Sequence, residues 1–99
     1  METKKSFSLQ IEHKAFNFDE WKKTFDSDPI DRKKSGVLSY RIFRPTDDPD
    51  YVIVDMEFDN LKNAQDTLSA LKNLWIQAEG KVMINPQTRI VELIENKVY

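Results

Sequence analysis

His13 is the side chain of this sequence best suited to proton transfer, because histidine has an ordinary pKa near neutrality and the chain holds one. It follows Phe7, Leu9 and Ile11 at every second position, so we expect all four side chains on one face of a strand. A histidine at the end of that strand could act as an acid, a base or a hydrogen-bond donor at the rim of a pocket. A hydrogen-bonded structural histidine is the alternative, and the residues leave both roles open.

Four aromatic residues are spaced so that they could surround a flat ligand. Trp21 and Phe25 lie one helical turn apart, and Trp75 lies on the apolar stripe of a later predicted helix. Tyr40 lies in a predicted strand, and the sequence does not show which face of the sheet it occupies. Aromatic residues at helical spacing form plain core more often than a binding pocket, so both interpretations stay open.

Three polar side chains also have a binding and a structural interpretation. Asn17 could polarise the carbonyl group of a ligand, although its place before a helical pattern favours an N-cap. Arg41 and Arg44 could hold an anionic substrate. An ion pair with Asp55 or Glu57 is the simpler role for these arginines.

Several kinds of chemistry are excluded by residue type. The chain has no cysteine, which excludes disulfides, thiolate metal sites and a cysteine nucleophile. A single histidine excludes a metal site built from several histidines of one chain, so we expect no metal. There is no glycine-rich phosphate loop and no Gly-x-Ser-x-Gly nucleophile motif.

The length of 99 residues predicts a single domain over 1–99, with an ordered core over about 6–95. Hydrophobic residues make up 39% and charged residues 32%, and the net charge of −2 gives no basic surface for nucleic acid. No apolar stretch is long enough for a signal peptide or a membrane span. We therefore expect a cytoplasmic protein with neither a nucleic acid nor a membrane as its partner.

The first half of the chain reads as a strand, a helix and a hairpin. Alternation predicts a strand over 6–13, and a helix begins after Asn17. Gly36 is a natural left-handed terminator of this first helical segment. Strands predicted over 37–44 and 51–58 are joined by a segment dense in turn-forming residues, so they form a hairpin.

The second half repeats the order helix and strand. A helical stripe predicts a segment over 60–78, with the asparagine at its start as N-cap. Ser69 offers a second cap midway, which would divide this stretch into two short helices. Gly80 ends it, and a loop closed by Pro86 leads to a strand over 88–95. The order βαββαβ predicts a ferredoxin-like α+β fold, with one four-stranded antiparallel sheet and both helices on one face.

Several predicted strands carry apolar side chains on both faces, whereas the chain has one helical layer to cover them. The second faces of three strands include Tyr51 and Ile53, Val37 and Phe43, and Val91 and Leu93. An exposed patch of that size is uncommon on a monomer. A second copy of the sheet is the simplest cover, so the sequence predicts a two-fold homodimer.

Short motifs along most of the chain carry a resemblance to a known superfamily. They are the strand end and helix start over 13–22, the segments over 32–44 and 54–61, and the loop that holds Gly80 and Pro86. This pattern resembles the dimeric α/β-barrel proteins that include the antibiotic-biosynthesis monooxygenases. The resemblance implies two sheets packed across a homodimer, with a small pocket in each subunit between sheet and helices.

The same resemblance supplies three functional hypotheses. Some members of the superfamily oxidise aromatic polyketides without metal or flavin, and others isomerise small ring compounds. The leading hypothesis is a homodimer that binds a small aromatic or polyketide-like molecule, with His13 in proton transfer, no cofactor and a possible monooxygenase or isomerase activity. A non-catalytic dimerisation or ligand-sensing module is the alternative. Haem binding or degradation is disfavoured, because the haem-degrading relatives use a helical histidine and His13 ends a strand.

Overall fold

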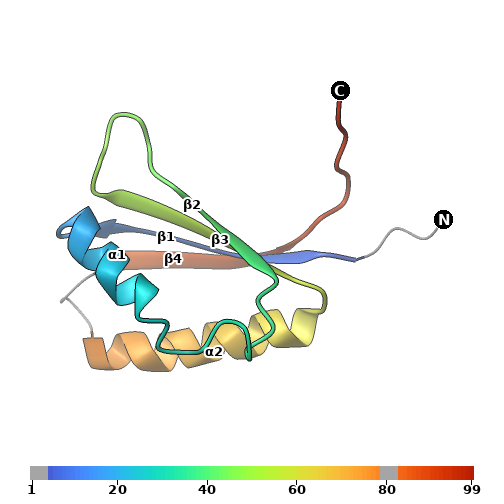
Figure 1. Cartoon of the computed structure of the whole chain (residues 1–99), viewed down its shortest axis with the longest axis horizontal. Coiled ribbons are helices and arrows are strands. Elements are labelled where there is room, and N and C mark those ends of the chain that lie inside the picture. Colours follow the sequence, from blue (N-terminus) through green and yellow to red (C-terminus); the bar gives the residue numbers. More distant parts are fainter. Residues whose placement is uncertain (1–4, 79–82) are drawn as a thin grey trace.

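A computed structural model describes residues 5–78 and 83–99 of the chain. Four strands form one antiparallel sheet in the order β2-β3-β1-β4, and both helices lie on the same face of it (Figure 1). This arrangement confirms the predicted ferredoxin-like fold. In chain order the elements are β1 (Phe7–Ala15), α1 (Phe18–Asp26), β2 (Ser39–Phe43), β3 (Tyr51–Phe58), α2 (Leu61–Ala78) and β4 (Met83–Glu92).

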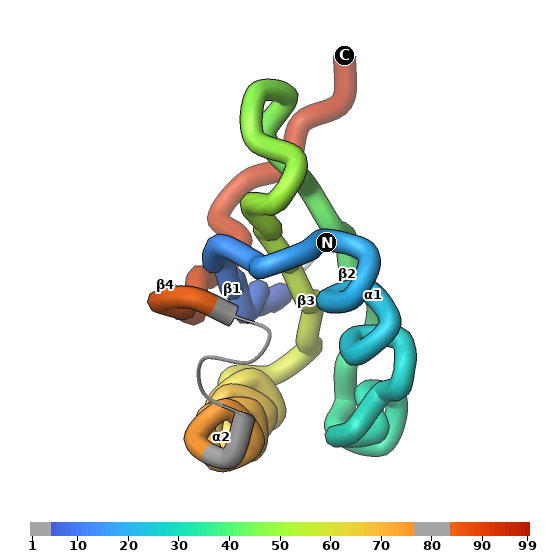
Figure 2. The backbone as a smooth tube through the Cα atoms, turned by 90° about the vertical axis from the view of Figure 1, so that its left-hand side faces the viewer, coloured from blue at the N-terminus to red at the C-terminus, as the bar shows by residue number. Residues whose placement is uncertain are grey.

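The hydrophobic core lies between the two central strands and the helices. Side chains of β1 and β3 alternate between this core and the other face of the sheet. The buried apolar residues are Leu9, Ile11, Ala15, Trp21, Val52, Val54, Met56, Phe58, Ala64 and Leu71. In Figure 2, α2 and the segment that follows α1 lie apart from each other beneath the sheet.

Helix α2 is continuous through Ser69, so the predicted division into two short helices is wrong. Ser69 is exposed and points to water, while Ala64, Leu68 and Leu71 form one apolar stripe that packs on the core. That packing holds the helix together across the serine. The expected end at Gly80 lies outside the described residues.

The turn before β2 explains the role of Gly36. Helix α1 already ends at Asp26, so Gly36 does not terminate it. Instead, Val37 N–H donates to the Arg32 carbonyl at 3.0 Å and Gly36 N–H donates to the Lys33 carbonyl at 3.2 Å. These two bonds form a Schellman motif, and the φ of 95° at Gly36 is the left-handed conformation that the motif needs.

Strand β4 starts earlier and ends earlier than the pattern predicted. Pro86, which was expected in the loop before the strand, lies inside it. Pairing with β1 shifts register between Glu12 and Lys14, so Asn85 and Pro86 together lie opposite His13. This is a β-bulge on an edge strand, where a proline without an N–H is tolerated. Asn85 has a positive φ of 51°, which allows the extra residue.

The bounds of the other strands differ little from expectation. β3 matches its predicted range, β1 extends two residues further, and β2 is shorter at both ends. Among the residues that the structure describes, no helix is both long enough and apolar enough to cross a membrane.

Candidate functional site

A cavity of about 190 Å³ lies between α1, the segment that follows it, and α2. Met56 of β3 contributes from the sheet, and Trp21 and Trp75 contribute from the two helices. The lining residues are Trp21, Thr24, Phe25, Ser27, Pro29, Ile30, Arg32, Met56, Leu71, Leu74 and Trp75. The structure therefore brings together three of the predicted binding residues, Trp21, Phe25 and Trp75, in one apolar site.

Helix α1 positions its aromatic residues through a well-formed N-terminus. Asn17 has an extended backbone, and its Oδ1 accepts from the Glu20 backbone N–H at 3.1 Å, so it is an N-cap. One helical turn then separates Trp21 from Phe25, and their ring centroids lie 5.2 Å apart. Asn17 itself is exposed and does not line the cavity.

Tyr40 lies on the helix-covered face of the sheet, opposite Met56 of β3. Its ring meets the ring of Phe25 edge-on at 5.0 Å. It does not line the cavity, but it borders an adjoining surface depression together with Arg32. Tyr40 thus packs from outside the cavity against Phe25, which lines it.

His13 faces the core, as the alternation predicted, and only 2% of its surface is exposed. Its ring lies 5.7 Å from the ring of Trp21, and it is not among the residues that line the cavity. Nδ1 lies 3.2 Å from the carbonyl oxygen of Lys14, which can only accept, so this contact places a proton on Nδ1. Burial lowers the pKa of His13 below its ordinary value, against a smaller opposing effect of that carbonyl.

Arg32 is the one charged residue among the described lining residues that the sequence analysis did not predict. Its side chain is 15% exposed, and Nη1 donates to the Phe25 carbonyl oxygen at 2.8 Å. The guanidinium lies over the rings of Phe25, at 4.1 Å from the centroid, and of Tyr40, at 5.1 Å. The spacing of Asp28 and Arg32, four residues apart, was the available signal, because it permits the ion pair that the structure shows at 3.5 Å.

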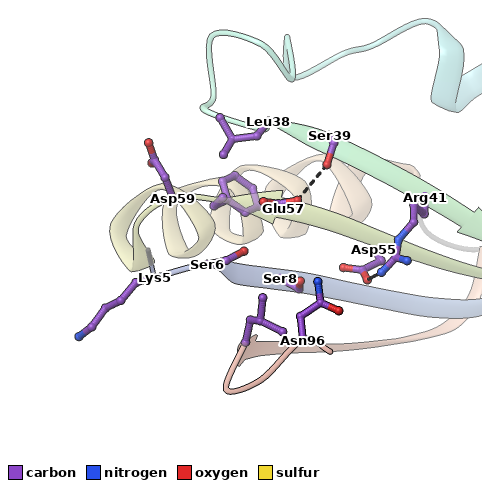
Figure 3. Close-up of a pocket in the computed structure, with 12 residues that line it drawn as sticks. Lys5, Ser6, Ser8, Leu38, Ser39, Arg41, Asp55, Glu57, Asp59 and Asn96 are labelled. Carbon is purple, nitrogen blue, oxygen red and sulfur yellow. Dashed lines mark hydrogen bonds and ion pairs between the residues drawn. The ribbon is translucent and has the colours of Figure 1, made fainter. Parts of the chain in front are cut away.

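The opposite face of the sheet has a second hollow, of about 600 Å³, near the starts of β1 and β2 (Figure 3). Arg41 reaches from β2 to Asp55 of β3 at 3.1 Å, and Ser39 donates to Glu57 at 3.2 Å. Asn96, from the segment after β4, borders the same hollow. Arg41 therefore takes the ion-pair role that the sequence left open.

The outer face of the sheet carries hydrogen-bonded pairs as well as apolar side chains. Besides the pairs made by Arg41 and Ser39, Tyr51 donates to Glu12 at 2.9 Å and Arg89 donates to Gln10 at 2.7 Å. The expected apolar residues lie between these pairs, because cross-strand register places them there: Phe43 opposite Ile53, and Val91 opposite Ser8. The result is a mixed surface of hydrogen-bonded pairs and apolar side chains.

Within residues 5–78 and 83–99, no cluster of three or more histidine, aspartate or glutamate side chains could hold a metal ion. Arg44, the other arginine considered for an anionic substrate, lies over the ring of Phe18 at 4.7 Å instead of lining the cavity.

Neither a known protein-family model nor a curated protein sequence matches this chain. Solved structures do match it over nearly its whole length. A protein of unknown function from Nitrosomonas europaea has a TM-score of 0.74 at 16% identity, with 99% of this chain and 98% of that chain covered. A monooxygenase from Streptomyces coelicolor, solved in complex with nanaomycin D, has a TM-score of 0.65 at 12% identity, with 99% and 96% covered.

A dimeric ferredoxin-like protein from an uncultured marine organism has a TM-score of 0.60 at 10% identity, with 95% of this chain and 99% of that chain covered. These likenesses are in fold, since the identities are low. The predicted resemblance to ferredoxin-like proteins of the monooxygenase type is thus confirmed at the level of the fold, and its neighbours include a dimer and a ligand complex.

Proposed function

We propose that this protein is a homodimer that binds a small aromatic compound in the cavity between α1 and α2. The observation that carries the proposal is the cavity wall, in which Trp21, Phe25 and Trp75 line one apolar cavity that is partly open to solvent. Flat aromatic walls favour a flat aromatic ligand, because ring stacking adds to the burial of apolar surface. The volume of about 190 Å³ suits a compound of one or two rings better than a larger one.

The activity that we propose for this site is oxidation of the bound ring compound by O₂ without a metal or flavin. In such a reaction a ring CH₂ and O₂ become a ring carbonyl and water, so the substrate supplies all four electrons. The nanaomycin D complex of the Streptomyces coelicolor monooxygenase supports the idea of an aromatic ligand in this fold. His13 would act behind Trp21, as a neutral residue that positions the indole ring.

A ligand-sensing module without catalysis is the second candidate. It is favoured by one observation: within the part of the chain that the structure describes, Arg32 is the one ionisable side chain that lines the cavity, and no lining residue there is an acid or base with an ordinary pKa near neutrality. Oxygen uptake by the protein with a bound aromatic compound separates the two candidates. Uptake above that of the compound alone supports the monooxygenase, and its absence with every bound compound supports the sensor.

Ligand binding itself can be tested with calorimetry on a panel of one-ring and two-ring aromatic compounds, charged and neutral. Leu74→Trp should fill part of the cavity and weaken binding by about tenfold or more. Ile76→Trp is the matched control, because Ile76 is on the same helix, 73% exposed and outside the cavity lining. Binding that survives Leu74→Trp, or a panel in which nothing binds, would contradict the proposal.

The homodimer would use the outer face of the sheet. Leu93 borders the hollow on that face and is 50% exposed in the single chain. Phe43, at the end of β2, is 46% exposed. A second copy would cover them and could also pair with Arg41 and Asp55 across the interface. The dimeric neighbour with the same fold supports this arrangement.

Sedimentation velocity at micromolar concentration tests the dimer. We expect the mass of two chains for the natural protein and of one chain for Ile53→Lys, which places a charge in the middle of the outer face. Ile76→Lys makes the same change on the exposed side of α2 and should stay dimeric. A natural protein that sediments as one chain would rule out the dimer.

A further inference from the structure

We propose that Arg32 makes the cavity selective for aromatic compounds that carry an anionic oxygen, such as a carboxylate or a phenolate. This inference rests on the proposed function, since it names the class of ligand that the same cavity takes. It starts from the composition of the lining. Among the described residues that line the cavity, Arg32 is the only charged one, and the others are apolar or carry a hydroxyl group.

The position of the Arg32 side chain is unusual for a charged group. It is 15% exposed, whereas the side chain of Arg41, on the other face of the sheet, is 72% exposed. A guanidinium keeps its positive charge in proteins, and withdrawing that charge from water is costly unless partners compensate for it. The partners of Arg32 therefore decide whether the site has unused capacity for an anion.

Those partners satisfy only part of the guanidinium. To the described residues it makes one side-chain hydrogen bond, from Nη1 to the Phe25 carbonyl oxygen at 2.8 Å. The same Nη1 lies 3.5 Å from Oδ1 of Asp28, which already accepts from the Arg32 backbone N–H at 2.9 Å. A guanidinium has five N–H donors, so Nε and Nη2 keep donors for a further acceptor.

The rings of Phe25 and Tyr40 hold the guanidinium in place, because it lies over both of them. A planar cation held this way is preorganised, and it loses little side-chain entropy when an anion binds. Asp28 lines the adjoining depression and not the cavity, so Arg32 is the charged side chain that a ligand inside the cavity meets among the described residues. Arg32 borders both the cavity and the adjoining surface depression, which places the charge where a polar substituent could meet water while the rings are buried.

Stabilising the turn after α1 is the simpler role of Arg32, since its bond to Phe25 satisfies a carbonyl at the helix C-terminus. This role and anion binding can coexist, but they differ in what they predict. A merely structural arginine would affect folding and the binding of all ligands alike. An anion-binding arginine would separate charged from neutral ligands of equal shape.

Calorimetry with 2-naphthoate and 2-naphthamide makes that separation, because the two compounds share rings and size and differ in charge. We expect the natural protein to bind the carboxylate about tenfold or more tightly than the amide. Arg32→Gln should remove this preference, and Arg32→Lys should keep part of it, as a point charge without the fork of donors. Lys62→Gln is the matched control, because it removes a positive charge from the exposed side of α2, where the Lys62 side chain is 80% exposed and outside the cavity lining, and it should leave the preference intact.

The outcomes distinguish this inference from the proposed function. Equal binding of the two compounds by the natural protein would overturn the role of Arg32 and leave the aromatic cavity standing. Binding of neither compound would count against both. If Arg32→Gln does not fold, Arg32→Lys and the salt dependence of naphthoate binding still decide, because an anion site weakens with salt and an amide site does not.

Discussion

The imidazole ring of His13 lies 5.7 Å from the indole ring of Trp21, with 59° between the two planes. His13 is on the core face of β1, and Trp21 lines the cavity from α1. The contact therefore joins the only histidine of the chain to one of the two tryptophans that face the proposed ligand. A change in the charge of His13 would therefore act on Trp21, which lines the cavity.

Stability should fall below about pH 6.5 because of His13. Burial lowers its pKa in the folded state, so the unfolded chain binds the proton more readily. Its contribution is complete above the unfolded pKa and is lost as the pH falls towards the folded pKa. We expect the free energy of unfolding to decrease by up to about 1.4 kcal/mol per pH unit in that window.

Urea denaturation at about pH 7.5 and about pH 5.5 measures this loss, in a range where histidine is the side chain that ordinarily titrates. His13→Gln is the control, since the chain has no other histidine. At the higher pH the variant should be less stable than the natural protein, and its free energy of unfolding should change little between the two pH values. A natural protein whose stability is the same at both values would show that His13 does not titrate as described.

Asn17 should matter for stability and not for ligand binding. Its side chain caps α1, so Asn17→Ala should lower the free energy of unfolding by about 1 kcal/mol. Asn17→Asp keeps an accepting oxygen at the cap, so it should keep the stability. It removes the side-chain amide N–H, which is the donor that a ligand carbonyl would need. Calorimetry of both variants with the aromatic panel decides: weaker binding by a stable Asn17→Asp would restore the ligand-contacting role.

Gly36→Ala should destabilise the protein by about 1–2 kcal/mol, because φ at this position is in the left-handed region. A Cβ there would also come within 2.5 Å of Nδ2 of Asn63. Thermal or urea denaturation measures the loss, and the same substitution in an Asn63→Ala background separates its two causes. If the second background recovers all of the lost stability, the contact alone is responsible and the backbone argument fails.

Thr67→Val should leave the protein as stable or raise its free energy of unfolding by up to about 1 kcal/mol. Thr67 is 2% exposed, and among the described residues its Oγ1 has no hydrogen-bond partner. Valine has nearly the same shape and removes the unsatisfied hydroxyl group. Thr67→Ser, which keeps the hydroxyl and deletes the methyl group, should be destabilised by about 1 kcal/mol. A clear loss of stability in Thr67→Val would reveal a hydrogen bond to this hydroxyl.

The sequence by itself determined the order of elements and the inward face of each central strand. Alternation placed His13 with Leu9 and Ile11, and the helical spacing placed Trp21 above Phe25, since these patterns depend on residues a few positions apart. The cap at Asn17 was equally local. All three could be predicted because a repeating backbone geometry fixes which side chains share a face.

Only the tertiary structure decided what depends on segments that are distant along the chain. It placed Tyr40 on the helix-covered face, kept α2 whole through Ser69 by packing, and fitted Pro86 into a bulge opposite His13. It also brought Arg32, whose spacing from Asp28 indicated an ion pair and not a cavity, into the wall of the cavity. These outcomes depend on cross-strand register and on the packing of side chains between elements, and neither is encoded in a local pattern.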